Sequence, residues 1–307
     1  HAAAVDRLEA CLRTDPLHSQ GLLLRSTVLR RYRDPLAGAA HERAATALPQ
    51  NAAAQAALGD FLWESGEVER ACSSFRRAES LDPTSFRTAA GARLLLPTVY
   101  RSADDLVEKR HAYGVGLAEL EAVADRFCHR RPGGLADTSW TNFYLAYQGN
   151  DDLSLQSRFG DLLCRVVDAR APVRARLRAS PPPRERMRVG FLSHFFFNCT
   201  AGRYFSSWIT DLDPARYEKI VFYTNHVSSS DTEVIAKSAD RFHRVSGRSI
   251  ERVAALVVEE QLDVLIYPEL GMHADTFSLA ALRLAPIQLA GWGHPCTPGL
   301  PTLDGYL

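Results

Sequence analysis

Residues 52–85 read AAAQAALGDFLWESGEVERACSSFRRAESLDPTS, a pattern that predicts two antiparallel helices joined by a short turn. Small residues such as Gly59 and Ala71 let the two helices approach closely, and Phe75 can fill the groove between them. Pro83 ends the second helix, because proline has no backbone N–H to donate to the next turn. The stretch therefore predicts one unit of a helical repeat.

The same unit recurs towards the start of the chain. Its closing proline stands at Pro16, Pro49 and Pro83, with spacings of 33 and 34 residues. That spacing is the period of the tetratricopeptide repeat (TPR), whose helix pairs stack into a superhelix with a concave groove. We expect TPR repeats over residues 1–100 and a groove that captures a polypeptide. The alternative is a spacer or a dimerisation arm.

Helical patterns without repeat marks continue over residues 101–183. Residues 140–149 gather aromatic side chains around two amides, and we interpret this segment as packing at a junction between the two halves of the chain. The run Ser180-Pro181-Pro182-Pro183 predicts a stiff, extended linker. We therefore place a second boundary at residue 184.

The pattern changes near Met187. From there, short apolar runs alternate with helical stretches, an arrangement that indicates a parallel sheet covered on both faces. The apolar runs lie at residues 188–193, 220–224, 264–267 and 287–290. We therefore predict an α/β lobe over residues 184–307, with its ligand beyond the carboxyl ends of the strands.

Four segments follow these strands and are candidate ligand-binding loops: residues 193–203, 225–226, 269–273 and 293–299. No GxGxxG or GxxxxGK[ST] motif accompanies them, which argues against an ordinary dinucleotide or P-loop site. The sequence Thr200-Ala201-Gly202 could begin a helix whose free N–H groups meet an anion or a sugar oxygen. Two glycines and two prolines within residues 293–299 predict a loop of fixed shape.

The composition argues against several kinds of partner. The chain carries 36 basic and 36 acidic side chains, so no net charge recruits nucleic acid or an anionic membrane. It has no apolar run of about 18 residues that could span a bilayer. Its six cysteines are scattered without a CxxC pair, which predicts reduced thiols, no metal site and a cytoplasmic location.

The chain resembles the protein O-GlcNAc transferases and their SPINDLY relatives. The likeness rests on the order of the repeats, the aromatic junction, residues 188–202 and, above all, residues 282–306, where LRLAPIQ is followed by WGHPCTPG and DGY. The resemblance implies an α superhelix of TPR repeats joined to the first Rossmann-like lobe of a GT-B glycosyltransferase. It also implies that the second, nucleotide-binding lobe of such enzymes is not among these 307 residues.

The resemblance further implies a reaction. Members of this family move a sugar from a nucleotide to a serine or threonine hydroxyl, with inversion and without a metal or other cofactor. We expect UDP-N-acetylglucosamine as the donor, with a fucose donor as the alternative, and acceptor polypeptides held in the TPR groove. By this likeness Gly293, Pro295 and Thr297 would line the sugar pocket. The residues beside the acceptor would be Asn198, Cys199, Thr200 and Gly202.

Three positions depart from the family's pattern. Relatives usually carry histidine in place of Cys199, many carry aspartate in place of Phe195, and a histidine expected near Thr141 is missing. General-base catalysis needs a proton acceptor within hydrogen-bond reach of the hydroxyl, and the sequence identifies none. The resemblance also implies that the lysine and helix terminus that offset the charge of the leaving diphosphate belong to the second lobe, so we expect the 307-residue chain alone to be inactive. The alternative function is a non-catalytic TPR interaction module with a decayed glycosyltransferase lobe.

Overall fold

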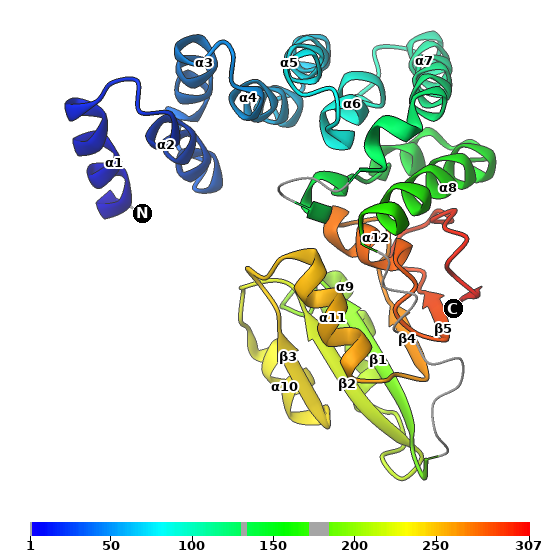
Figure 1. The fold of residues 1–307 in the computed structure, drawn as a ribbon. Coiled ribbons are helices and arrows are strands. Elements are labelled where there is room, and N and C mark those ends of the chain that lie inside the picture. Colours follow the sequence, from blue (N-terminus) through cyan, green and yellow to red (C-terminus); the bar gives the residue numbers. More distant parts are fainter. Residues whose placement is uncertain (1, 130–133, 172–183) are drawn as a thin grey trace. The chain divides into compact units, whose positions relative to one another are not determined.

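The computed structural model describes residues 2–129, 134–171 and 184–307 (Figure 1). It divides into two compact units, His1–Phe127 and Cys128–Leu307. The first unit holds the repeat helices, and the second holds the parallel sheet with the helices that surround it. The predicted linker at residues 180–183 lies outside the described residues. The predicted division at residues 100 and 183 stays a prediction.

Consecutive helices of the first unit pack against one another as the repeat pattern requires. The turns that hold Pro16, Pro49 and Pro83 each separate one helix pair from the next, so the proline-phased repeat is confirmed. The unit continues with a longer helix, α7, and a 3-10 turn. Its elements are α1 (Ala2–Thr14), α2 (Ser19–Arg31), α3 (Ala37–Ala47), α4 (Ala52–Glu64), α5 (Val68–Leu81), α6 (Phe86–Arg93), α7 (Ala103–Ala122) and η1 (Ala124–Phe127).

The ring of Phe75 on α5 explains why small residues recur in the repeat. This ring is fully buried, and it lies against one glycine on each neighbouring helix. A Cβ atom on Gly59 of α4 would lie 2.9 Å from the ring, and one on Gly91 of α6 would lie 2.6 Å from it. A side chain at either position would push the helices apart. One aromatic side chain therefore joins three consecutive helices.

A histidine is buried beside this core. His41 on α3 is 1% exposed, stacks on Phe61 with the ring centroids 5.2 Å apart, and has no hydrogen-bond partner for either ring nitrogen among the described residues. Burial, reinforced by the nearby Arg30 guanidinium, lowers the pKa of His41 to about 4. The imidazole is therefore neutral at physiological pH and behaves as a flat, mainly apolar core residue.

Six strands of the second unit form one parallel sheet in the order β3-β2-β1-β4-β5-β6, which confirms the predicted α/β lobe. Because parallel crossovers are right-handed, α9 and α10 lie on one face of the sheet and α11 and α12 on the other. The strands are β1 (Met187–Ser193), β2 (Tyr217–Tyr223), β3 (Arg241–Arg244), β4 (Val264–Tyr267), β5 (Ile287–Ala290) and β6 (Gly305–Tyr306). The crossover helices are α9 (Thr200–Thr210), α10 (Ser230–Ser238), α11 (Ile250–Glu259) and α12 (Ala274–Ala281).

The core of this lobe lies between the sheet and α9 and α10. Phe191 of β1 and Val221 of β2 are buried there against Phe205 of α9 and Ile235 of α10. The strand order places β1 between β2 and β4, so the ends of β1 and β4 are neighbours although about 75 residues separate them in sequence. That adjacency decides which post-strand residues meet.

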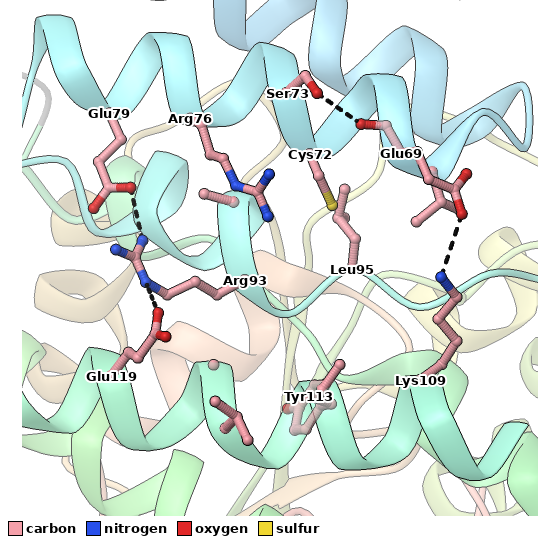
Figure 2. Close-up of a pocket in the computed structure, with 15 residues that line it drawn as sticks. Glu69, Cys72, Ser73, Arg76, Glu79, Arg93, Leu95, Lys109, Tyr113 and Glu119 are labelled. Atoms are coloured by element: carbon pink, nitrogen blue, oxygen red, sulfur yellow. Dashed lines mark hydrogen bonds and ion pairs between the residues drawn. The ribbon is translucent and has the colours of Figure 1, made fainter. Parts of the chain in front are cut away.

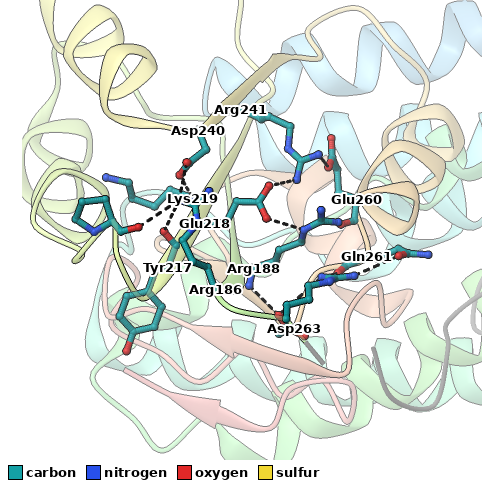
Figure 3. A network of polar contacts seen from close by, with 12 residues as sticks. Arg186, Arg188, Tyr217, Glu218, Lys219, Asp240, Arg241, Glu260, Gln261 and Asp263 are labelled. Carbon is teal, nitrogen blue, oxygen red and sulfur yellow. Dashed lines mark hydrogen bonds and ion pairs between the residues drawn. The ribbon is translucent and has the colours of Figure 1, made fainter. Parts of the chain in front are cut away.

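An ion-pair network fixes the amino-terminal edge of the sheet (Figure 3). Glu218 of β2 accepts hydrogen bonds from Arg188 of β1, at 2.8 Å, and from Arg241 of β3. Glu260, which follows α11, pairs with Arg241 at 2.9 Å and with His243 at 2.6 Å. These half-buried charges tie three strands together. The loops that could hold a ligand lie at the opposite edge of the sheet, where the strands have their carboxyl ends.

Helices that precede the sheet also belong to the second unit: η2 (Gly134–Thr138), η3 (Phe143–Gln148) and α8 (Leu153–Arg170). Gly160 of α8 touches the backbone of Gly299, and a Cβ atom on Gly160 would collide with the Gly299 carbonyl oxygen. Gly299 itself has φ +66, in the left-handed region that favours glycine, and its Cα faces the backbone of Gln156. This glycine contact fastens the loop after β5 to α8.

Candidate functional site

The carboxyl edge of the sheet brings polar side chains together from four strands. β1 ends at Ser193 and leads into His194, and β2 leads into Thr224 and Asn225. The chain after β4 supplies Glu269 and His273, and the chain after β5 supplies Gly293 and His294. All of these residues except Thr224, which directly precedes the second segment, come from the four segments expected from the sequence to hold the ligand.

Glu269 is the centre of this cluster. Its Oε1 accepts a hydrogen bond from the Ser193 hydroxyl at 2.8 Å and from the backbone N–H of His194 at 3.3 Å. Its Oε2 is buried and has no partner among the described residues. Burial raises the pKa of Glu269 to about 7, because the low-dielectric surroundings penalise the carboxylate more than these two hydrogen bonds stabilise it. The carboxyl group therefore titrates near neutral pH.

The hydrogen bonds of His194 fix its tautomer. Asn225 Oδ1 accepts from the backbone N–H groups of His226 and Val227, so the Asn225 amide nitrogen must point at His194 Nε2, 3.0 Å away. Nε2 then accepts and carries no proton, while Nδ1–H donates to Thr224 Oγ1 at 2.9 Å. Burial, with the neighbouring His273, lowers the pKa of His194 to about 4. The ring is neutral, and both its nitrogens are engaged.

His273 stacks on this neutral ring, with the centroids 3.7 Å apart and the planes 12° from parallel. It precedes α12, and its carbonyl accepts from the Thr276 hydroxyl at 2.8 Å and from the Phe277 N–H at 3.2 Å. Its Nδ1 is buried without a partner among the described residues. Burial lowers the pKa of His273, and the nearby Asp275 carboxylate partly opposes that effect. This imidazole is therefore neutral and uncommitted.

Gly293 lies in contact with the same cluster. A Cβ atom on Gly293 would lie 2.7 Å from the Cβ of Glu269 and 2.7 Å from the ring of Phe205 on α9. The preceding residue, Trp292, packs on Phe205 and on Tyr204, with centroid distances of 5.0 and 5.3 Å. The loop after β5 is thus connected to the loop after β1 through Glu269 and α9. The expectation that Gly293 lines a sugar pocket stays a prediction.

The other two residues predicted for that pocket lie elsewhere in the loop. Pro295 is exposed. Thr297 is also exposed, accepts from the Gly299 N–H at 3.3 Å, and lines a small cavity of about 270 Å³ together with Asp304 and Tyr306. Gly293 therefore lies against Glu269 in the polar cluster, whereas Thr297 lines a separate cavity with Asp304 and Tyr306.

The four residues predicted to lie beside the acceptor form the start of α9. The Cys199 thiol caps this helix, because its Sγ accepts from the Gly202 N–H at 3.5 Å while it donates to the Phe195 carbonyl at 3.3 Å. A side chain on Gly202 would collide with the Phe197 carbonyl. Thr200 is exposed, as is Asn198, whose backbone N–H donates to the Ser229 hydroxyl at 2.9 Å. The helix start predicted at Thr200 is confirmed.

The aromatic segment at residues 140–149 packs against these loops. The Thr141 hydroxyl donates to the Gly271 carbonyl, and the Phe143 ring stacks on His294 with the centroids 5.3 Å apart. A Cβ atom on Gly271 would lie 2.6 Å from the His294 ring, so only glycine allows this approach. His294 is 3% exposed and is held as part of the packing. The predicted packing role of the aromatic segment agrees with these contacts.

Two residues of the cluster, Glu269 and His273, were not singled out from the sequence as site residues. Both lie in the segment after β4 that was predicted to be a candidate ligand loop. The signal that could have identified them is an acid and a histidine four residues apart, directly after a buried strand. No group of three metal-ligating side chains occurs within the described ranges. Nor is any helix described there long and apolar enough to cross a membrane.

The repeat unit has a cavity of its own, about 590 Å³, between α5 and α7 (Figure 2). Its two ends are bridged by ion pairs, Arg93 with Glu79 at 2.7 Å and Lys109 with Glu69 at 3.3 Å. Arg76 stands between these pairs, and no carboxylate of the described chain pairs with it. The wall therefore presents an uncompensated guanidinium.

No family model matches the chain. It is similar to the probable UDP-N-acetylglucosamine–peptide N-acetylglucosaminyltransferases SPINDLY of Arabidopsis thaliana (27% identity over 128 residues) and Oryza sativa subsp. japonica (29% over 123). These matches cover 40% and 38% of this chain but only 14% and 13% of the relatives. The chain thus spans a small part of their length.

A solved structure shows the same fold over nearly the whole chain. A variant of the Thermobaculum terrenum O-GlcNAc transferase superposes with a TM-score of 0.55 and 22% identity, covering 94% of this chain and 53% of that protein. The shared fold is a helical repeat followed by a parallel α/β lobe. The chain is therefore similar in sequence, over about two-fifths of its length, to the SPINDLY proteins, and similar in fold, over almost all of its length, to an O-GlcNAc transferase.

Proposed function

We propose that this chain is the repeat and acceptor-side part of a protein O-glycosyltransferase. The complete protein would transfer a sugar, N-acetylglucosamine from UDP-N-acetylglucosamine as the first candidate, to serine or threonine hydroxyls with inversion. The observation that carries the proposal is the cluster around Glu269, His194 and His273 at the carboxyl edge of the sheet. In an α/β lobe this edge is where ligands bind, and the cluster includes one neutral imidazole, that of His273, whose Nε2 makes no hydrogen bond within the described residues.

The repeat unit would hold the acceptor polypeptide. The cavity between α5 and α7 combines apolar atoms of Leu95 with charged side chains, and it could take an extended segment with a carboxylate near Arg76. If so, Arg76→Glu should raise the KM for a peptide acceptor and leave the KM for the donor unchanged. Arg43→Glu is the matched control, because Arg43 is exposed on α3 away from this cavity. Equal KM values for both variants would contradict a role for the cavity.

A non-catalytic interaction module remains the competing function. Cys199 and Phe195 favour it, since both stand where relatives carry ionisable residues and both serve the start of α9 in this structure. In that case the repeat unit would bind polypeptides and no sugar would be transferred.

The deciding experiment uses the full-length protein. It is incubated in parallel with radiolabelled UDP-N-acetylglucosamine and GDP-fucose, each with a serine- and threonine-rich peptide, in the presence and absence of EDTA. Incorporation from the first donor, insensitive to EDTA, is the expected result. Incorporation from the fucose donor alone would correct the donor. No incorporation from either donor, together with retained peptide binding, would establish the interaction module instead.

A further inference from the structure

We propose that His273 accepts the proton of the attacking hydroxyl, an assignment that rests on the function proposed above. The acceptor oxygen bonds to the anomeric carbon of the nucleotide sugar, and the bond from that carbon to the diphosphate oxygen breaks. The diphosphate leaves with the electron pair, and the hydroxyl proton passes to Nε2 of the neutral His273 tautomer that carries its own proton on Nδ1.

Other titratable groups at this edge of the sheet are either engaged in hydrogen bonds or buried away from a substrate. Both nitrogens of His194 are engaged, by Thr224 and Asn225. Glu269 is only 2% exposed, and its free oxygen is sealed from solvent. His294 is 3% exposed beneath the Phe143 ring.

The nearby carboxylate of Asp275 and the thiol of Cys199 also make hydrogen bonds within the protein. The Asp275 carboxylate accepts from the Ser139 hydroxyl. The thiol of Cys199, which stands where relatives carry a histidine, donates to the Phe195 carbonyl. His226 is exposed and follows β2. It is the remaining rival, and it is tested directly below.

His273 differs from all of these because its Nε2 makes no hydrogen bond within the described residues and is not sealed from solvent, whereas its Nδ1 is buried. The half-buried ring can therefore meet a substrate hydroxyl through one nitrogen only. A single accessible acceptor is what proton transfer in a defined direction requires.

The ring is also held in place before any substrate arrives. One face stacks on His194 at 3.7 Å, and the hydrogen bonds of His194 keep that supporting ring from rotating. The backbone of His273 is fixed by the first turn of α12. His194 is accordingly a positioning residue, and Glu269 positions His194 through its backbone N–H.

The charges around His273 suit a proton acceptor. Burial lowers its pKa, so the ring is neutral and ready to accept at physiological pH. Once protonated, the imidazolium faces the Asp275 carboxylate from α12, and that attraction stabilises the charged form. The neighbouring His194 ring remains neutral, so it does not repel this positive charge.

The test compares His273→Gln, His226→Gln and the exposed control His129→Gln in the full-length protein. Transfer of radiolabelled sugar is measured across the acid and neutral pH range, with donor affinity measured separately by calorimetry. For His273→Gln we expect kcat to fall by about 100-fold or more, with donor affinity and acceptor KM unchanged. The acid limb of the wild-type kcat profile, lying below pH 6.5, should disappear in this variant. His226→Gln and His129→Gln should retain the wild-type kcat and the acid limb of its pH profile.

A second variant separates proton transfer from folding. His273→Ala opens a slot against the His194 ring, and added imidazole should stack there and restore part of the rate. Rescue of a misfolded protein by imidazole is not expected, so restoration supports the assignment. If the wild type transfers sugar while His273→Gln keeps its rate and its acid limb, or if His226→Gln loses them instead, the assignment is wrong and the proposed function stands. A wild type that transfers no sugar would overturn both.

Discussion

Replacing Glu269 by glutamine should make the stability of the second unit less dependent on pH. Glutamine keeps an oxygen that can accept from the Ser193 hydroxyl, and it removes the ionisable group. In the native protein the pKa of Glu269 is raised from 4.5 to about 7 by burial. Between these two values the unfolded chain is ionised at this position while the folded chain still holds the proton. Stability is therefore lost as pH rises through this window.

The size of the effect follows from the two pKa values of Glu269. A tenfold change in an ionisation constant corresponds to about 1.4 kcal/mol, so the rise from 4.5 to about 7 corresponds to roughly 3 kcal/mol at pH values above both. Since the side chain is 2% exposed, solvent screening removes little of this. Between about pH 5 and about pH 8, Glu269→Gln should gain about 2–3 kcal/mol relative to wild type.

Urea unfolding followed by tryptophan fluorescence measures this difference, because Trp140, Trp208 and Trp292 all lie in the second unit. Comparing the same variant at two pH values cancels any constant cost of a buried amide. It also cancels the opposite pH dependence of His194, which is present in both proteins. Glu233→Gln is the control, since Glu233 is exposed on α10 and its replacement should shift stability equally at both pH values. A pH-independent difference for Glu269→Gln would refute the reasoning.

Three further substitutions test the packing. Phe75→Ala should destabilise the first unit by about 3–5 kcal/mol in urea unfolding followed by circular dichroism, and a change no larger than that of Phe75→Leu would contradict its role. Gly160→Ala forces the Gly299 carbonyl away and should cost the second unit about 1–3 kcal/mol, so an unchanged midpoint would count against that contact. Gly293→Val should abolish transfer by the full-length protein while leaving acceptor binding intact, because its side chain would displace the loop from Glu269. Normal turnover by Gly293→Val would show that the loop after β5 has only a structural role.

The repeat and the parallel lobe were predictable because their signals are local. Pro49 and Pro83 mark helix ends in sequence, and continuous apolar runs such as residues 188–193 need no partner to be recognised. Strand β3 gave no such signal. Arg241, His243 and Arg244 make it a polar edge strand, and it forms because Glu218 and Glu260 pair with its charges. Those partners lie on other elements.

The sequence predicts which segments form the site, but it does not predict the contacts between their side chains. The stack of His273 on His194 depends on β4 lying beside β1, and the strand order is a property of the whole sheet. The buried state of Glu269 is likewise invisible in the run Tyr267-Pro268-Glu269-Leu270, where an acid after a strand would be expected to face solvent. Cys199, read from the sequence as a departure from the family, proves to be the cap of α9.

The position of Phe75 between Gly59 and Gly91 has a consequence for how the repeat array comes apart. Arrays of repeats usually unravel one unit at a time, because each unit contacts only its neighbours. Here one ring is shared by α4, α5 and α6, so pulling either outer helix away exposes the same aromatic surface. The middle of the array should therefore give way in a single step under mechanical load, and α1 to α3 should detach earlier as a separate event.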